Sequence, residues 1–219
     1  MTPDILTPEQ KHLLEKIGQE RTISERFYLT GGTALAGFYL HHRYSEDLDF
    51  FSEQEVDAEG LSVFFHTITK EFQIRKIDFE QSFNRNLFFL TFPSGILKAE
   101  FTYFPFPRLR KGATHAGVTI DSLEDIGVNK LFTIYQRTKA RDYIDLYCIC
   151  KKQGYTIHHL VMKARAKFDT YIDPLQLGTQ FVKASEAQDL PRMIQKVPSE
   201  DWQQFFIEEA KRLKSEVVE

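Results

Sequence analysis

The spacing of apolar side chains changes along the chain and predicts mixed α/β structure followed by helices alone. Thr7, Pro8 and the acidic residue after them are typical of a helix start, and apolar side chains continue from there at helical spacing. Strands are predicted where aromatic and β-branched residues cluster between turn residues. The predicted strands are residues 26–30, 46–51, 72–82, 86–92 and 96–104, and the predicted helices are 8–17, 33–42 and 58–72.

Beyond residue 120 the pattern is helical only. Ser122 with Asp125 three residues later approximates a capping box, which marks the start of a helix. The helices predicted here are residues 122–137, 141–153, 156–168, 174–184 and 199–215. We therefore predict an α+β fold, in which a mixed sheet flanked by helices over residues 1–120 precedes an all-helical domain over residues 121–219.

Composition narrows the class of protein without identifying it. Hydrophobic residues make up 42% and charged residues 27% of the 219 residues, as in soluble globular proteins. The net charge of −3 does not favour a nucleic-acid binder as a whole. The basic segments 108–112 and 137–141 are either local RNA contacts or solvated surface. No signal peptide and no apolar stretch near the ~20 residues of a membrane span are present, so we expect a cytoplasmic protein.

Two aspartates stand in a predicted strand, where aspartate is disfavoured. Alternate residues of a strand face the same way, so Asp47 and Asp49 lie side by side, about 6.5–7 Å apart along the backbone. Two carboxylates so placed repel each other unless a cation joins them. Mg²⁺ takes carboxylate oxygens and leaves positions for substrate phosphates. The pair predicts either a metal site for phosphoryl or nucleotidyl transfer, or a solvated strand face.

Residues before and after this pair could complete such a site. Gly31 and Gly32 separate a strand from a helix, where glycine allows close approach and the helix start offers free N–H groups to an anion; Thr33 adds a hydroxyl. An ordinary tight turn is the alternative. In the strand 96–104, alternation places Glu100 on the same face as Lys98. Glu100 is a third carboxylate for the metal if the strands are neighbours, and otherwise a solvated side chain.

The helical half contains charged residues on otherwise apolar faces. Lys130 lies in a stripe with Ile126 and Ile134, so it either extends to water or meets an anion in a cleft. Asp142 and Asp145 are three apart on the next helix and share a face, and Arg141 could form a plain i,i+4 ion pair with Asp145. Cys148 and Cys150 point to opposite sides of that helix and are interpreted as reduced thiols.

Two composite motifs resemble one known family. The stretch "YLTGGTALAGFYLHHRYSEDLDFF" has the form G-G-T-x-L followed by R-x-S-x-D-L-D-F, and "DIGVNKLFTIYQRTKARDYIDLY" has a helical Lys, an Arg and then R-D-x-x-D-L. Both resemble the signatures of the AbiEii/AbiGii-type nucleotidyltransferase toxins. The resemblance covers roughly residues 20–150, and it implies a DNA polymerase beta-like nucleotidyltransferase core with a helical C-terminal domain.

The resemblance also implies roles for individual residues. The catalytic residues would be Asp47, Asp49, Lys130 and Asp145. The nucleotide would be bound by Gly31, Gly32, Thr33, Arg43, Ser45 and Lys130, and the metal by Asp47 and Asp49, with Glu100 added from its position.

The expected function is metal-dependent transfer of a nucleotide from NTP to an acceptor hydroxyl, with Mg²⁺ or Mn²⁺ as cofactor. By resemblance the acceptor is RNA, such as tRNA, or protein, and a cognate antitoxin is an expected partner. Two alternatives stay open: a non-catalytic nucleotide-binding or partner-binding module of the same fold, and a small-molecule nucleotidyltransferase of the antibiotic-modifying kind.

Overall fold

The computed structural model describes residues 5–218, and these residues form two compact units. Unit 1 contains the described residues up to Tyr39, together with Ser45–Pro107 and Lys111–Asp121. Unit 2 contains Leu40–Tyr44, Arg108–Arg110 and the chain from Ser122 onward. The boundary predicted at residue 120 did not include these two short segments, because nothing in the local sequence pattern marks them.

Unit 1 is built on one mixed sheet. Its strands are β1 (Tyr28–Thr30), β2 (Leu48–Ser52), β3 (Lys76–Ser82), β4 (Arg85–Phe92), β5 (Gly95–Tyr103), β6 (Thr114–His115) and β7 (Val118–Ile120). Their order in the sheet is β3-β4-β5-β2-β1-β7-β6. The pairs β2–β5 and β1–β7 are parallel and the others are antiparallel. β6 and β7 were not predicted, because they are very short and lie in a glycine-rich, basic segment.

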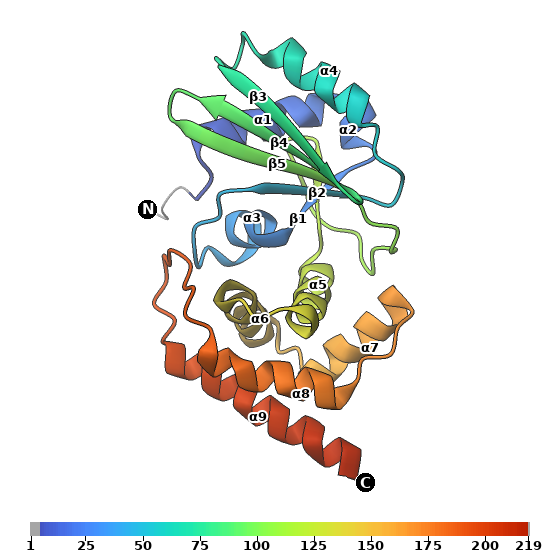
Figure 1. Ribbon diagram of the computed structural model, residues 1–219, viewed down its shortest axis with the longest axis vertical. Coiled ribbons are helices and arrows are strands. Elements are labelled where there is room, and N and C mark those ends of the chain that lie inside the picture. The colour runs from blue at the N-terminus through green and yellow to red at the C-terminus, as the bar shows by residue number, and fades with distance from the viewer. Residues whose placement is uncertain (1–4, 219) are drawn as a thin grey trace. The chain divides into compact units, whose positions relative to one another are not determined.

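One face of this sheet is apolar and the other is partly polar. Phe50, Phe88 and Phe101 are buried on the apolar face. The ring of Phe65, on helix α4 (Ala58–Ile68), lies 4.7 Å from that of Phe88 and 6.0 Å from that of Phe101, so α4 covers this face (Figure 1). Residues on alternate positions, including Asp49 on β2, therefore lie on the opposite face.

Of the other helices of unit 1, α1 begins where the sequence predicts, α2 was not predicted, and α3 begins two residues before the predicted start at Thr33. Helix α1 (Pro8–Gln19) carries a complete capping box between Thr7 and Gln10, which satisfies two backbone donors at its start. It is followed by the single turn α2 (Arg21–Ser24). Helix α3 (Gly31–Leu35) begins directly after β1 and continues as a π-helical turn, Ala36–Leu40. Gly31 is therefore the first residue of this helix, and with its φ of +70° it makes the glycine turn from β1 into α3.

Unit 2 is helical, apart from an isolated bridge between Arg43 and Met193. Its helices are α5 (Leu123–Gln136), α6 (Ala140–Gln153), α7 (Ile157–Phe168), α8 (Pro174–Val182) and α9 (Ser199–Val218). Their apolar faces share a core that contains Tyr143, Phe181, Trp202 and Phe206, and α8 lies along α9 (Figure 1). Together with the mixed sheet of unit 1, these helices confirm the predicted α+β fold class.

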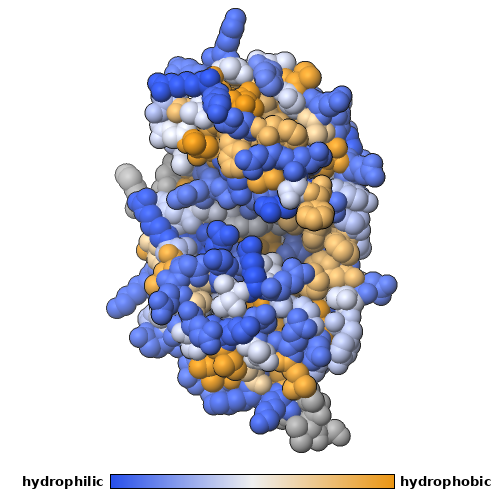
Figure 2. Space-filling model, in the orientation of Figure 1, coloured by the Kyte–Doolittle hydropathy of each residue, from blue (hydrophilic) through white to orange (hydrophobic). Residues whose placement is uncertain are grey.

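The surface agrees with the composition. On the face drawn in Figure 2, hydrophilic residues predominate and hydrophobic residues form scattered patches. Within residues 5–218, no helix combines the length and the apolar character that a membrane crossing requires.

A buried ion pair gives a test of the core of unit 2. The ammonium of Lys167 lies 2.8 Å from the carboxylate of Asp125, and both side chains are 0% exposed. We expect Asp125→Asn to lower the free energy of unfolding by about 3–5 kcal/mol, because it deprives a buried ammonium of this carboxylate. Urea unfolding followed by fluorescence of Trp202, the one tryptophan of the chain, measures the loss.

Lys211→Met is the matched control, because it removes the exposed Lys211–Glu208 pair of the same unit. We expect a change below about 1 kcal/mol for this variant. Equal effects of the two substitutions would contradict the assignment of the buried pair to the core.

Candidate functional site

The predicted carboxylates of unit 1 meet on the polar face of the sheet. In the parallel pairing of β2 with β5, Asp49 is directly opposite Glu100, and on the other side of β2 it is opposite Thr30 at the end of β1. Asp47 immediately precedes β2, and its carboxylate, like that of Glu100, lies near the Lys98 ammonium. The strand order, and not sequence proximity, brings Glu100 beside the aspartate pair.

A lysine side chain lies among these carboxylates. The Lys98 ammonium is 2.8 Å from Asp47 Oδ2 and 3.6 Å from Glu100 Oε2. Burial opposes its charge, but the hydrogen bond to Asp47 and the negative charges of all three acids raise the pKa of Lys98 above its ordinary value. Within residues 5–218, no group of three or more His, Cys, Asp or Glu side chains is gathered as a ready-made metal cage.

Glu100 is held by three hydrogen bonds. Arg85 donates two hydrogen bonds to its carboxylate, both at 2.6 Å, and the Thr102 hydroxyl donates a third at 3.0 Å. Burial opposes ionisation, yet the hydrogen bonds and charge of Arg85 hold the pKa of Glu100 below its ordinary value. The Asp47 side chain, by contrast, is 41% exposed and can exchange its partner more readily.

The glycine turn lies directly against Asp49. Gly31 has a φ of +70°, and a Cβ added to it would lie 2.6 Å from Asp49 Oδ2. The position therefore requires glycine both for its backbone conformation and for its closeness to the carboxylate. The hydroxyl of Thr33, two residues further on, donates a hydrogen bond to the carbonyl of Asp47. The predicted phosphate cradle and the predicted metal pair are thus in contact within unit 1.

Two polar residues that the sequence analysis did not select support this site. The buried side chain of Gln10 donates to the carbonyls of Ser45 and Glu46, at 3.1 and 2.9 Å, and so fixes the chain just before Asp47. Asp121, at the end of β7, is 0% exposed and accepts a 2.7 Å hydrogen bond from the Thr30 hydroxyl. Gln10 is marked in the sequence, because it is a glutamine on the apolar side of a capped helix. No local feature of the sequence marks Asp121.

The other predicted residues gather in unit 2, around Asp145. Arg43 donates two hydrogen bonds to the Asp145 carboxylate, both at 2.7 Å, and His42 Nε2 lies 2.8 Å from the same group. The Lys130 ammonium is also 2.7 Å away. Asp145 is 0% exposed, so three cationic or polar partners enclose it. His42 was not selected from the sequence, because a histidine pair carries no local signal for this contact.

The same lysine joins the two aspartates of α6. Lys130 lies 2.7 Å from Asp142 as well, and Arg137 donates to the second oxygen of Asp142 at 2.9 and 3.0 Å. Burial opposes ionisation of Asp142 and Asp145, but the charge of Lys130 and then of the nearby arginines lowers both pKa values, that of Asp145 the more. Lys130 therefore meets anions inside unit 2 instead of extending to water.

The basic segments are partly neutralised by acids of unit 2. Arg110 donates to Glu124 at 2.6 Å, and the backbone N–H groups of Leu109 and Arg110 donate to Asp125 at 2.8 and 3.0 Å. In the second segment Lys139 lies 3.5 Å from Asp189. These contacts favour an anchoring role for at least part of both segments.

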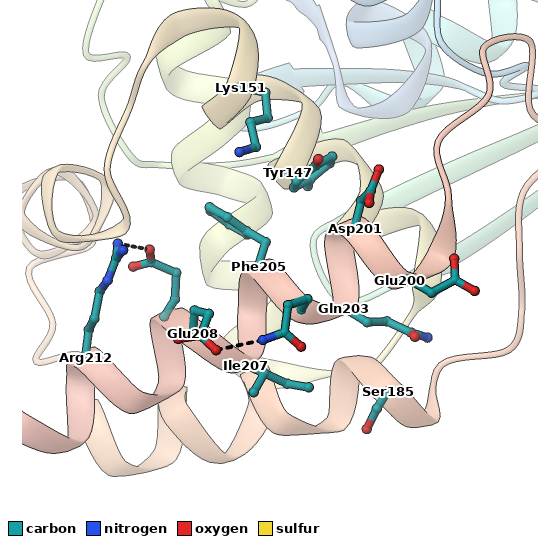
Figure 3. Close-up of a pocket in the computed structure, with 12 residues that line it drawn as sticks. Tyr147, Lys151, Ser185, Glu200, Asp201, Gln203, Phe205, Ile207, Glu208 and Arg212 are labelled. Atoms are coloured by element: carbon teal, nitrogen blue, oxygen red, sulfur yellow. Dashed lines mark hydrogen bonds and ion pairs between the residues drawn. The ribbon is translucent and has the colours of Figure 1, made fainter.

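Unit 2 also contains a groove, with a cavity volume of about 990 Å³, between α6 and α9 (Figure 3). Tyr147 and Phe205 meet edge to face at 5.5 Å on one side of it, with the ammonium of Lys151 over both rings. None of the residues predicted to bind nucleotide or metal lines this groove.

The two cysteines carry no candidate chemistry. Both are free, and burial raises the pKa of Cys148 and of Cys150 to about 12. They are therefore protonated thiols at neutral pH, and a thiol is a much weaker nucleophile than a thiolate.

Comparison with known proteins gives one family. The family described as "Nucleotidyl transferase AbiEii toxin, Type IV TA system" matches residues 12–214. The uncharacterized protein aq_aa25 of Aquifex aeolicus (strain VF5) is 32% identical over 164 residues, which cover 74% of this chain and 76% of that protein.

Solved structures show the same fold. JHP933 from Helicobacter pylori superposes with a TM-score of 0.60 at 20% identity, covering 95% of this chain and 90% of that one. MenT4, nucleotidyltransferase toxin Rv2826c from Mycobacterium tuberculosis H37Rv, superposes with a TM-score of 0.58 at 16% identity, covering 94% and 82%. At these identities the likeness supports the fold alone, and it confirms the predicted nucleotidyltransferase-like architecture.

The buried Asp145 cluster predicts a pH effect on stability. The pKa of Asp145 in the folded protein is well below its ordinary value, and that of the unfolded chain is about 3.9. The stabilisation is therefore complete above about pH 5 and is lost as the pH falls through 3.9 towards the folded-state pKa. We expect wild-type stability to fall more steeply between pH 5 and 3 than that of Asp145→Asn, which is less stable at pH 6.

Urea unfolding at several pH values, followed by Trp202 fluorescence, measures both curves. Asp201→Asn serves as the control, since Asp201 is an exposed carboxylate of the same unit, and its curve should follow wild type. Parallel curves for wild type and Asp145→Asn would contradict the lowered pKa.

Proposed function

Because the chain belongs to the AbiEii family of nucleotidyltransferase toxins, we propose that unit 1 binds an NTP with Mg²⁺ or Mn²⁺ and transfers its nucleotide to an acceptor hydroxyl. The family match covers residues 12–214 and confirms the resemblance found in the two sequence motifs. Nucleotidyl transfer and membership of a toxin family follow from it. The metal, the residues that act and the acceptor are the content of the proposal.

The observation that carries the proposal is a pair of aspartate carboxylates, one of which already binds a cation, the ammonium of Lys98. Asp49 lies on β2 and Asp47 immediately before it, and Asp47 binds the Lys98 ammonium at 2.8 Å. Carboxylate oxygens are the protein ligands that hard divalent ions prefer, and the ammonium at Asp47 shows that this carboxylate is open to a cation. Asp47 and Asp49 would hold such an ion, with Glu100 as a third ligand once Arg85 releases it.

The turn that starts at Gly31 would receive the triphosphate. Its backbone comes against the Asp49 carboxylate, and the start of α3 presents backbone N–H groups to an anion. Thr33 donates a hydrogen bond to the Asp47 carbonyl and so holds the start of α3 next to the residue that precedes β2. Ser45, whose carbonyl is held by Gln10, belongs to the loop that leads into the aspartates.

The reaction is an in-line attack of an acceptor hydroxyl oxygen on the α-phosphorus, with pyrophosphate as the leaving group. A divalent ion, when bound, supplies charge neutralisation at the phosphate oxygens. The chain itself supplies orientation: the glycine turn would align the triphosphate, and the two aspartates would fix the position of the divalent cation. Positioning and electrostatics of this kind provide most of the rate in phosphoryl transfer.

The packing around Lys130, Arg43 and Asp145 supports a role for these residues in holding one another in position. The resemblance places Lys130 and Asp145 among the catalytic residues, yet both carboxylate oxygens of Asp145 are occupied and the group is 0% exposed. Removing a partner from a buried ion pair costs several kcal/mol. Asp145 therefore holds Arg43 and Lys130 in place within unit 2.

The acceptor is proposed to be a hydroxyl of an RNA end, such as that of tRNA, or of a protein, and an antitoxin is the proposed partner. Incubation of the purified protein with labelled NTPs, and separately with bulk tRNA or total protein, identifies the acceptor class. Binding of nucleotide without any labelled product would favour a non-catalytic module, and labelling of a small molecule alone would favour the antibiotic-modifying alternative.

Asp47→Asn and Asp49→Asn should each reduce nucleotide transfer by at least about 100-fold, because a neutral amide cannot hold the cation that the phosphates require. The measurement is incorporation of labelled NTP, with thermal unfolding recorded to exclude loss of fold. Asp78→Asn is the control, since Asp78 is an exposed acid of β3 paired with Lys76. Wild-type transfer by both site variants would overturn the proposal.

Gly31→Ala should weaken NTP binding by at least about tenfold, because its Cβ would displace the Asp49 carboxylate. Gly154→Ala is a control for the backbone alone: Gly154 has a φ of +69°, and its added Cβ would have no neighbour within 4 Å. Both variants bear the left-handed backbone cost of about 1–2 kcal/mol. Fluorescence titration with an NTP analogue should separate them, and equal NTP affinities would contradict a cradle at Gly31.

A further inference from the structure

The polar face of the sheet carries a repeating charge pattern that the proposed reaction does not by itself require. Asp49 is opposite Glu100 in the parallel pairing, and the preceding same-face positions are Asp47 on the β2 side and Lys98 on β5. Three carboxylates and one ammonium therefore occupy four adjacent positions. Lys98 is 21% exposed, so it belongs to the wall of the site and not to the open surface.

The positive charge of Lys98 belongs mainly to Asp47. It lies 2.8 Å from that carboxylate and 3.6 Å from Glu100, while Glu100 has its own bidentate partner in Arg85 at 2.6 Å. Arg85 is therefore the main partner of Glu100, and Lys98 is the partner of Asp47. A divalent ion on Asp47 would come within a few ångströms of an ammonium, where like charges repel strongly.

We propose that the Lys98 ammonium occupies the cation site at Asp47 in the free protein. When Mg²⁺ or Mn²⁺ binds, Lys98 leaves Asp47 and its ammonium binds the phosphates of the nucleotide instead. This inference rests on the proposed function. The ammonium is tethered on the same sheet face as Asp49, whose carboxylate lies against the Gly31 turn, so a triphosphate held there offers it anionic oxygens. Lys98 is thus a positioning residue that links metal binding to nucleotide binding.

This arrangement has a thermodynamic consequence. Without nucleotide, the metal competes with the Lys98 ammonium for the Asp47 carboxylate, and the ammonium has no phosphate to which it can move. With nucleotide, the displaced ammonium gains a new anionic partner, so metal and NTP each increase the affinity of the other. Such coupling favours metal binding together with the substrate, while in the free protein Lys98 offsets the charge of Asp47.

The test is the Mn²⁺ dissociation constant, measured by electron paramagnetic resonance with and without a non-hydrolysable NTP analogue. We expect Lys98→Met to bind Mn²⁺ about tenfold more tightly than wild type without nucleotide, because the competing ammonium is gone. The increase in Mn²⁺ affinity on adding the analogue should be smaller than in wild type. Lys98→Arg keeps the charge and should stay close to wild type.

The control for overall charge is Lys76→Met, which removes an exposed lysine paired with Asp78 at 2.8 Å. Its Mn²⁺ affinity should match wild type, and a change equal to that of Lys98→Met would overturn the inference. Unchanged or weaker Mn²⁺ binding by Lys98→Met would also overturn it, while the proposed function would survive if Asp49→Asn abolishes Mn²⁺ binding. If wild type binds no Mn²⁺ with or without the analogue, the proposed metal site itself fails, and the inference with it.

Discussion

The candidate site depends on the register of β2 between β1 and β5. In this register Asp49 lies between Thr30 and Glu100, and the carboxylates face away from the core. A shift of β2 by one residue would turn Asp49 into the apolar layer and bring Phe50 out of it, so the buried phenylalanines fix where the acids lie. The electrostatic cost of neighbouring carboxylates is met by Lys98 and Arg85, and the packing of one sheet face thereby determines the chemistry of the other.

Exposure separates the roles of the two sets of acids. Asp47 is 41% exposed and held by a flexible lysine, so its partner can change at low cost. Asp145 is 0% exposed and accepts two hydrogen bonds from a planar guanidinium, an arrangement that is costly to open. Reactions need groups that exchange partners, whereas precise placement needs groups that do not. Asp47 of unit 1 suits the first requirement, and the cluster of unit 2 suits the second.

The sequence predicted what depends on local period and missed what depends on distant contacts. Alternation in 96–104 correctly placed Glu100 and Lys98 on one face, and the caps at Thr7 and Ser122 correctly marked helix starts. The bidentate partner of Asp145 is Arg43, 102 positions away, instead of the neighbouring Arg141 that helix spacing offered. Local spacing allows a pair, but only the tertiary fold decides which of the allowed partners reaches a buried charge.

The stretch between the glycine turn and the aspartates passes from unit 1 into unit 2 and back again. Residues 40–44 belong to unit 2, and the chain returns to unit 1 at Ser45. Gln195 donates to the carbonyls of Leu40 and His41, at 3.0 and 3.2 Å, and so holds the start of this segment. Gln10 holds its continuation through the carbonyls that follow Tyr44.

Between these two amide contacts stands Arg43, whose guanidinium is fixed by Asp145. Only three residues separate Arg43 from Asp47 in the sequence. The Arg and the Asp of the R-x-S-x-D-L-D motif therefore have different tasks: the Arg secures the backbone through a buried carboxylate, and the Asp presents its own carboxylate to a cation.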